Sequence, residues 1–198
     1  MQVKLQKSFP IEASPGDSWQ FLQDISEVAA CVPGARITEQ VDETNYKGQV
    51  VVKLGPVTAT FKGDLEVKGV DQEKRELQLT GKGMDSKGTS SATMDLNVAI
   101  QDEGEGNTQL VGDATVTVTG KLASFGARMM TQVADQILNQ FVVNFSNRVV
   151  AMGEGAEAEA AAAKVAEQPR EISALALIWQ TVIGFLKGLF GHKPSTSG

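Results

Sequence analysis

Apolar and polar residues alternate over much of residues 45–120, with the period of β-strands that bury one face. In "YKGQVVVKL", Tyr46, Val50 and Leu54 fall on one side and Lys47 and Lys53 on the other. Similar runs lie at 57–68, 77–83, 90–100 and 110–118, with weaker ones at 3–9 and 37–41. The pattern predicts an antiparallel sheet of about seven strands with one face exposed to water.

Two stretches break the alternation and predict helices. The first opens with Ser14, a helix-capping residue, has Pro15 at the first helical position, and closes at Gly34, which fits one or two short helices. Over 124–152 the apolar residues recur at three- and four-residue spacing, as in a long amphipathic helix: Met130, Val133, Ile137, Phe141 and Phe145. The predicted fold class is α+β, with a seven-stranded sheet wrapped around this C-terminal helix.

The composition divides the chain into a folded domain at 1–152 and three further segments. Residues 153–171 are rich in Ala and Glu and predict a flexible linker. Residues 172–191 hold no acidic residue and predict an amphipathic helix, and 192–198 predict a disordered tail. The predicted helix has an apolar face for membrane binding made of Leu175, Ile178, Trp179, Val182, Phe185, Leu186, Leu189 and Phe190.

The amphipathic segment 172–191 has alternative roles. It is marginal in length for a membrane-spanning helix, so we expect it to lie in the bilayer interface, although spanning stays open. It would also suit docking onto the protein's own core or onto a partner.

Many positions on the inward face of the predicted sheet are small, among them Gly63, Gly81 and Gly112. One interpretation is close approach of the helix together with strand curvature at the glycines. The other is an elongated apolar cavity for a lipid-like ligand. The cavity interpretation predicts this lining: Phe21, Ile25, Val32, Val50, Val52, Ala59, Phe61, Leu79, Gly81, Ala92, Met94, Leu96, Ala114, Val116, Met130, Val133, Ile137 and Phe141.

Charge and chemistry argue against several functions. The net charge of -6 and the lack of a basic stripe argue against nucleic acid as a partner. One cysteine, Cys31, and one histidine, His192, cannot form a zinc cluster or a disulfide, and no catalytic residues or covalent cofactor are predicted. The N-terminus lacks the apolar stretch of a signal peptide, so we expect a cytoplasmic, non-enzymatic protein.

Four segments carry a family resemblance: Trp19 and Asp24 followed by "CVPG" at 31–34, then "LGPVTATFKGDL", "GKLASFGARMM" and "QFVVNF". In this order and spacing they resemble the G-subunit family of carbon monoxide dehydrogenase, within the START-like, helix-grip (SRPBCC) superfamily, over roughly residues 1–150. The resemblance implies a cup-shaped sheet that grips a C-terminal helix around a hydrophobic pocket. It also implies association with carbon monoxide dehydrogenase or a related molybdenum hydroxylase, and attachment of that enzyme to the cytoplasmic membrane.

These observations lead to a functional hypothesis. The protein would recruit the hydroxylase to the cytoplasmic face of the cell membrane and carry a respiratory quinone, menaquinone or ubiquinone, that passes electrons to the respiratory chain. The alternatives are a membrane adaptor or an assembly factor for the hydroxylase without a ligand. A small-molecule enzyme of the helix-grip type is a further alternative.

Overall fold

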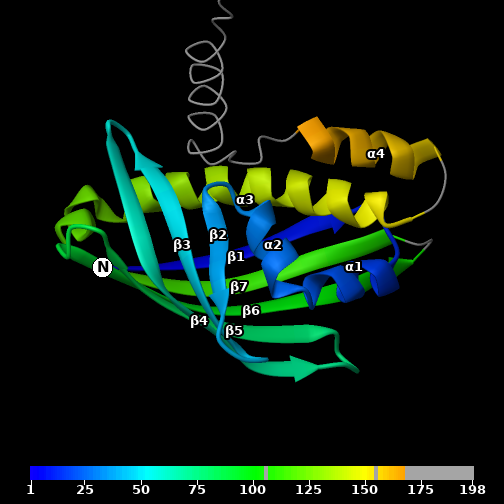
Figure 1. The fold of residues 1–198 in the computed structure, drawn as a ribbon, viewed down its shortest axis with the longest axis horizontal. Coiled ribbons are helices and arrows are strands. Elements are labelled where there is room, and N and C mark those ends of the chain that lie inside the picture. Colours follow the sequence, from blue (N-terminus) through cyan, green and yellow to red (C-terminus); the bar gives the residue numbers. More distant parts are fainter. Residues whose placement is uncertain (105–106, 154–155, 168–198) are drawn as a thin grey trace, which may run out of the picture.

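The computed structural model describes residues 1–104, 107–153 and 156–167. Figure 1 shows a curved sheet with one long helix, α3, lying across its concave side. The elements in chain order are β1 (Gln2–Ile11), α1 (Pro15–Leu22), α2 (Ile25–Cys31), β2 (Ala35–Gln40), β3 (Asn45–Leu54), β4 (Val57–Asp71), β5 (Glu76–Asp85), β6 (Ser90–Gly104), β7 (Asn107–Gly120), η1 (Lys121–Phe125), α3 (Gly126–Ala151) and α4 (Ala156–Glu167).

The seven strands form one antiparallel sheet in the order β1-β7-β6-β5-β4-β3-β2. The first strand therefore pairs with the last, and β1 and β2 are the edge strands of the sheet. The predicted fold class is confirmed for the sheet and for the long C-terminal helix, which has 26 residues. The predicted membrane segment at 172–191 and the tail at 192–198 lie outside the described residues and stay predictions.

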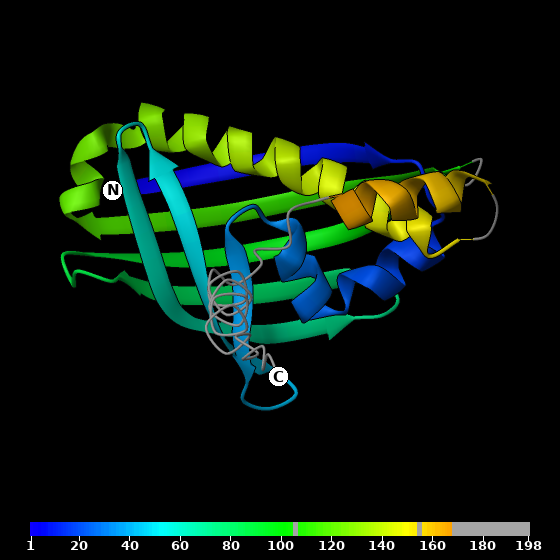
Figure 2. The same cartoon turned by 45° about the horizontal axis from the view of Figure 1, so that its top comes forward.

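The sheet bends sharply at three glycines that share one row on its concave face. Gly48 pairs with Gly63, and Gly63 pairs with Gly83 on the next strand. A Cβ atom built on Gly63 would lie 1.9 Å from the carbonyl oxygen of Lys82, so no side chain fits there. In Figure 2, β3 and the start of β4 rise steeply from the rest of the sheet. Strand curvature, and not empty space, therefore explains this row.

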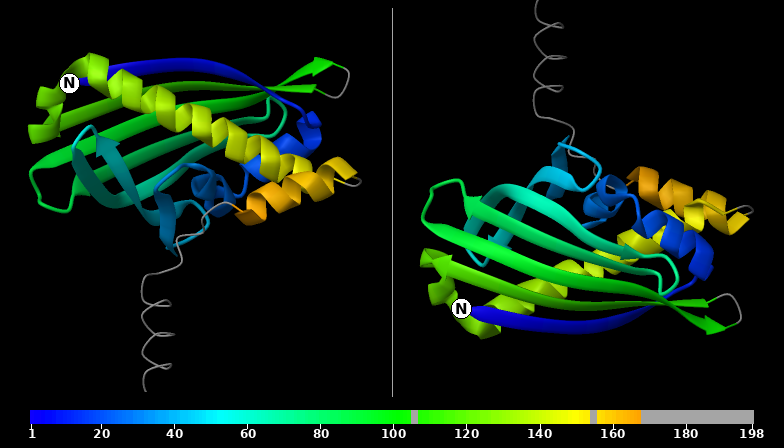
Figure 3. Two further views of the ribbon diagram at one scale, coloured as in Figure 1. Left: turned by 90° about the horizontal axis from the view of Figure 1, so that it is seen from above. Right: turned by 90° about the horizontal axis from the view of Figure 1, so that it is seen from below.

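The two short helices close one end of the sheet (Figure 3). Ser14 caps α1 as predicted, because its hydroxyl accepts a hydrogen bond of 3.0 Å from the Asp17 N–H, and Pro15 begins the helix. The indole N–H of Trp19 donates to the side chain of Gln72 at 2.8 Å. This bond ties α1 to the turn between β4 and β5.

Helix α4 corrects part of the linker prediction. Residues 156–167 were predicted to be flexible, but they form a helix that packs against α3. Ala158 and Ala161 are buried, because these small side chains, one turn apart, let the two helices approach closely. Alanine also has the highest helix propensity. None of the helices in the described part of the chain is both long and apolar enough to cross a membrane.

The turn between β5 and β6 is held by Asp85, which is 8% exposed. Its carboxylate accepts hydrogen bonds from the N–H groups of Thr89 and Ser90 at 2.7 and 2.8 Å, and from the Thr89 hydroxyl at 3.1 Å. Burial alone would raise the pKa of Asp85, but these hydrogen bonds outweigh it and hold the pKa below its ordinary value of 3.8. The ionised carboxylate therefore stabilises the folded state.

We expect Asp85→Asn to lower the melting temperature at pH 7. A depressed carboxyl pKa stabilises the fold at pH values above the unfolded-state pKa of 3.8, and this contribution is lost as the pH falls through the lower folded-state pKa. The difference between wild type and variant should therefore shrink below pH 3.8. Melting curves from pH 7 to pH 2 measure it, with Glu73→Gln at an exposed turn position as the control. A difference that does not change with pH would contradict the assignment.

Candidate ligand-binding site

The buried side chains form two separate clusters along the groove between sheet and helix. The helix-end cluster, under α1 and α2, comprises Ile11, Trp19, Phe21, Leu22, Ile25, Cys31, Tyr46, Leu77, Leu79, Val98, Ile100, Leu110, Phe145 and Val149. The hairpin-end cluster, near the β3–β4 turn and η1, comprises Leu54, Ala59, Val118 and Leu122. The core is therefore divided, and both sheet and helix pass from one cluster to the other.

Between the clusters, neighbouring elements carry apolar side chains that belong to neither. On β6, Ala92 packs against the hairpin-end cluster and Leu96 against the helix-end cluster, whereas Met94 between them joins neither. The same holds on α3 for Ile137, which lies between Val133 and Phe141. We call the following set the middle zone, and all its members are partly exposed: Val50, Gly81, Met94, Ala114 and Ile137.

The middle zone shares its partial exposure with the residues packed against the two clusters, such as Val52, Val116 and Phe141. Protein interiors are close-packed, and such positions are normally filled by neighbouring side chains. Gly112, on the same face of β7 one step from Ala114, would meet nothing within 4 Å if a Cβ were added. The concave face therefore has open space above Gly112, next to the middle zone.

The structure distributes the eighteen predicted lining residues over these regions. Those in or against the helix-end cluster are Phe21, Ile25, Leu79, Leu96 and Phe141. Those in or against the hairpin-end cluster are Val52, Ala59, Phe61, Ala92, Val116, Met130 and Val133. The others are partly exposed: Val32 and the five residues of the middle zone. Their role in lining a ligand site stays a prediction.

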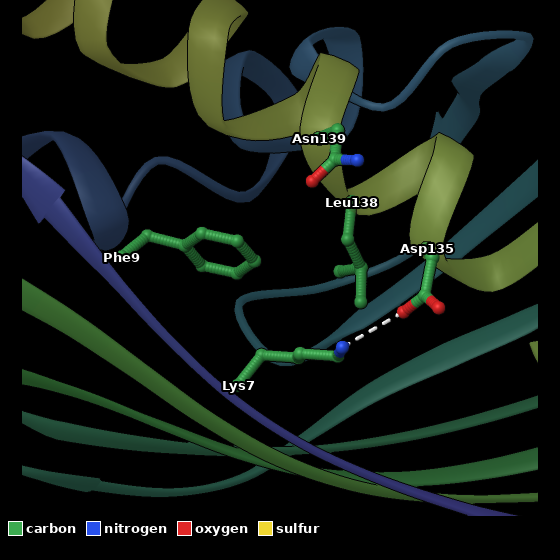
Figure 4. Close-up of a pocket in the computed structure, with 5 residues that line it drawn as sticks. All are labelled: Lys7, Phe9, Asp135, Leu138 and Asn139. Atoms are coloured by element: carbon green, nitrogen blue, oxygen red, sulfur yellow. Dashed lines mark ion pairs between the residues drawn. The ribbon is translucent and has the colours of Figure 1, made fainter.

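Two cavities open at the rims of the groove. The seam pocket, of about 260 Å³, lies between β1 and α3 and is lined by Lys7, Phe9, Asp135, Leu138 and Asn139 (Figure 4). The second, of about 420 Å³, lies between the α1–α2 junction and the β2–β3 hairpin and is lined by Gln23, Asp24, Ile25, Ser26, Gln40 and Tyr46. Of the predicted lining residues, Ile25 alone lines either of these two cavities.

The seam pocket lies beside Gly112, one step along β7 from Ala114 of the middle zone. Lys7 of β1 pairs in register with Gly112 of β7, and antiparallel partners project to the same face of a sheet. On α3, Asp135 and Leu138 flank Ile137. The polar seam pocket therefore adjoins the open space above Gly112.

Sequence reasoning missed Lys7 and Asp135. The signal was present for Lys7, because the alternation Val3, Leu5, Phe9 puts position 7 on the apolar face and a lysine occupies it. Asp135 had no comparable signal. It lies outside the apolar spacing of the predicted helix, where a charged residue is expected.

The described residues offer a binding surface and little reactive chemistry. Burial raises the pKa of the Cys31 thiol to about 12, so this group is protonated at neutral pH and is a poor nucleophile. No group of three or more His, Cys, Asp or Glu side chains in the described residues is placed to hold a metal ion. The described residues thus offer an apolar groove with polar groups in a cavity at each of two rims.

Comparison with solved structures shows the fold. A conserved protein from Geobacillus kaustophilus is 20% identical with a TM-score of 0.68, covering 75% of this chain and 95% of that one. A START superfamily protein from Mycobacterium smegmatis is 13% identical with a TM-score of 0.55, covering 76% and 99%. Norcoclaurine synthase from Thalictrum flavum, an enzyme by its name, is 13% identical with a TM-score of 0.52, covering 76% and 94%.

This fold thus occurs in enzymes as well as in other proteins. The function of a given chain therefore has to be argued from the side chains of its site and not from the fold. No curated protein matches the chain. The model of one protein family, described as the G subunit of carbon monoxide dehydrogenase (CoxG), matches residues 8–150, which include the end of β1, the other six strands, α1, α2 and nearly all of α3. The chain belongs to this CoxG family, the G-subunit family of carbon monoxide dehydrogenase.

Proposed function

We propose that this protein is a membrane-tethered carrier of a respiratory quinone that serves carbon monoxide dehydrogenase or a related molybdenum hydroxylase. The family and the START-like fold indicate a ligand-binding accessory protein. The proposal adds the ligand class, the membrane and the partner. The observation that carries it is the divided core, because it leaves a stretch of inward apolar surface between two packed clusters.

The middle zone favours a ligand that is mainly apolar. Its side chains, such as Met94 and Ile137, offer an aliphatic surface, and each methylene group buried there contributes about 0.8 kcal/mol. A quinone with a prenyl chain supplies many such groups, and its ring is flat. We call the space that it would occupy between sheet and helix, at the middle zone, the slot. The two closed clusters would hold the ligand across the groove, with its ends near the rims.

The tail and the family association supply the other parts of the proposal. The apolar face expected in residues 172–191 would place the domain at the cytoplasmic face of the bilayer, where quinones dissolve. The hydroxylase would transfer two electrons to the bound quinone, and two protons taken from water would complete the quinol. The quinol would then return to the bilayer and the respiratory chain.

Mass spectrometry of an organic extract of the purified full-length protein tests the ligand. We expect close to one isoprenoid quinone per chain. A variant ending at residue 167 should retain it, which separates quinone in the domain from lipid carried by the tail. If neither protein contains quinone or takes it up when it is added, quinone carriage is excluded. A protein that then still binds the hydroxylase would be a membrane adaptor or an assembly factor.

A further inference from the structure

Lys7 is a charged residue at an inward position of β1. It stands in the alternation of Val3, Leu5 and Phe9, and it pairs in register with Gly112, above which the space is open. Its Nζ lies 2.9 Å from Oδ1 of Asp135 on α3, and the two side chains are 41% and 40% exposed. The pair thus bridges the edge strand and the helix at the mouth of the seam pocket.

The other side chains of the seam pocket converge on the same space. In Figure 4 the ring of Phe9 and the side chain of Leu138 lie to one side of the ion pair, and the amide of Asn139 points into the same opening. The pocket therefore combines an aromatic face, an aliphatic wall and three polar groups.

We propose that the Lys7–Asp135 pair recognises the polar ring of the ligand, with the ammonium of Lys7 donating a hydrogen bond to a carbonyl oxygen. This inference rests on the proposed function and names the residues that would bind the polar ring of its ligand. Asp135 holds the ammonium in position and balances its charge. Because the pair is neutral as a whole, it favours an uncharged ligand with oxygen acceptors over a carboxylate.

The size of the seam pocket fits this role. Pockets for whole small ligands usually measure about 300–1,000 Å³. The seam pocket measures about 260 Å³, which suits one ring system. The apolar remainder of the ligand would continue past Gly112 into the middle zone.

Two probes with the same carbon skeleton, one with carbonyl groups and one without, test the inference on the full-length protein. Menadione (2-methyl-1,4-naphthoquinone) carries two carbonyl groups, and 2-methylnaphthalene has the same ring system and methyl group without them. Wild type should bind menadione more tightly. Lys7→Met should weaken menadione binding by about 10-fold or more, since hydrogen bonds from charged groups are strong, and should leave 2-methylnaphthalene unchanged.

Lys4→Met is the matched control, because Lys4 lies on the same strand but faces outward and is exposed. Asp135→Asn should weaken menadione binding less than Lys7→Met does, since it leaves the ammonium in place. Both seam variants should melt close to wild type, because a partly exposed ion pair contributes little stability. Melting curves therefore check that any loss is local.

The outcomes separate this inference from the proposed function. Equal loss of both probes in Lys7→Met, or no loss of either, would overturn recognition by Lys7 and leave carriage of an apolar ligand intact. Tighter binding of 2-naphthoate than of menadione would also overturn it, because the site would then prefer an anion. Binding of neither probe by wild type would contradict the proposed function, and this inference with it.

Discussion

Gly63→Ala is expected to destabilise the protein by about 3 kcal/mol or more. The new Cβ would lie 1.9 Å from the carbonyl oxygen of Lys82 and 2.5 Å from Cα of Gly83. Both atoms belong to the backbone of β5, so the clash is relieved only by separating β4 from β5. That separation would weaken the hydrogen bonds of the ladder where the sheet bends at the glycine row. Urea denaturation of wild type and variant measures the effect.

Gly112→Ala is the matched control for Gly63→Ala. Both glycines lie on the concave face of inner strands, but a Cβ on Gly112 would meet nothing within 4 Å. This substitution should leave stability unchanged or raise it by about 0.4–1 kcal/mol, because alanine restricts the unfolded chain. Equal destabilisation by the two substitutions would contradict the distinction between a bent row and an open space.

The arrangement of the sheet could be predicted because period-2 alternation is a local signal. The runs at 57–68 and 90–100 fall within β4 and β6, and Ser14 with Pro15 marks the start of α1 as predicted. One buried face imposes this pattern along each strand, independently of how the strands later curve. The order of the elements follows from the same signal.

The role of each glycine could not be predicted in this way. Gly63 and Gly112 occupy equivalent positions in the alternation, yet one touches backbone and the other faces open space. Sheet curvature decides between these outcomes, and it depends on contacts between strands far apart in the sequence. For the same reason, alternation alone could not separate the packed positions, such as Leu79, from the partly exposed ones, such as Gly81.

Two further features depended on tertiary contacts. The alanines of α4 gave a composition typical of a linker, and only α3 beside them provides a surface on which Ala158 and Ala161 are buried. Lys7 acquires its significance from Asp135, which lies more than one hundred residues away on another element. The sequence therefore predicted a site on the concave face, whereas the pairing of Lys7 with Asp135 became visible only in the fold.

Phe145→Ala is the second substitution for which we expect a large loss, about 3–5 kcal/mol. Phe145 is fully buried in the helix-end cluster, and its ring centroid lies 5.1 Å from that of Phe21 and 5.6 Å from that of Phe141. Truncation would remove these contacts and leave a cavity between α1 and α3. Urea denaturation measures the loss, with Val143→Ala, at a position on the same helix that is 53% exposed, as the control.

Ile137→Ala, two turns earlier on α3, should cost only about 1 kcal/mol, because a partly exposed side chain loses little burial on truncation. The contrast with Phe145→Ala follows from the divided core, since Ile137 belongs to neither cluster. Added quinone should raise the stability of wild type and raise that of Ile137→Trp far less, because the larger side chain would fill the slot. A cost for Ile137→Ala equal to that of Phe145→Ala would mean that the core is continuous through the middle zone. The slot on which quinone carriage depends would then not exist.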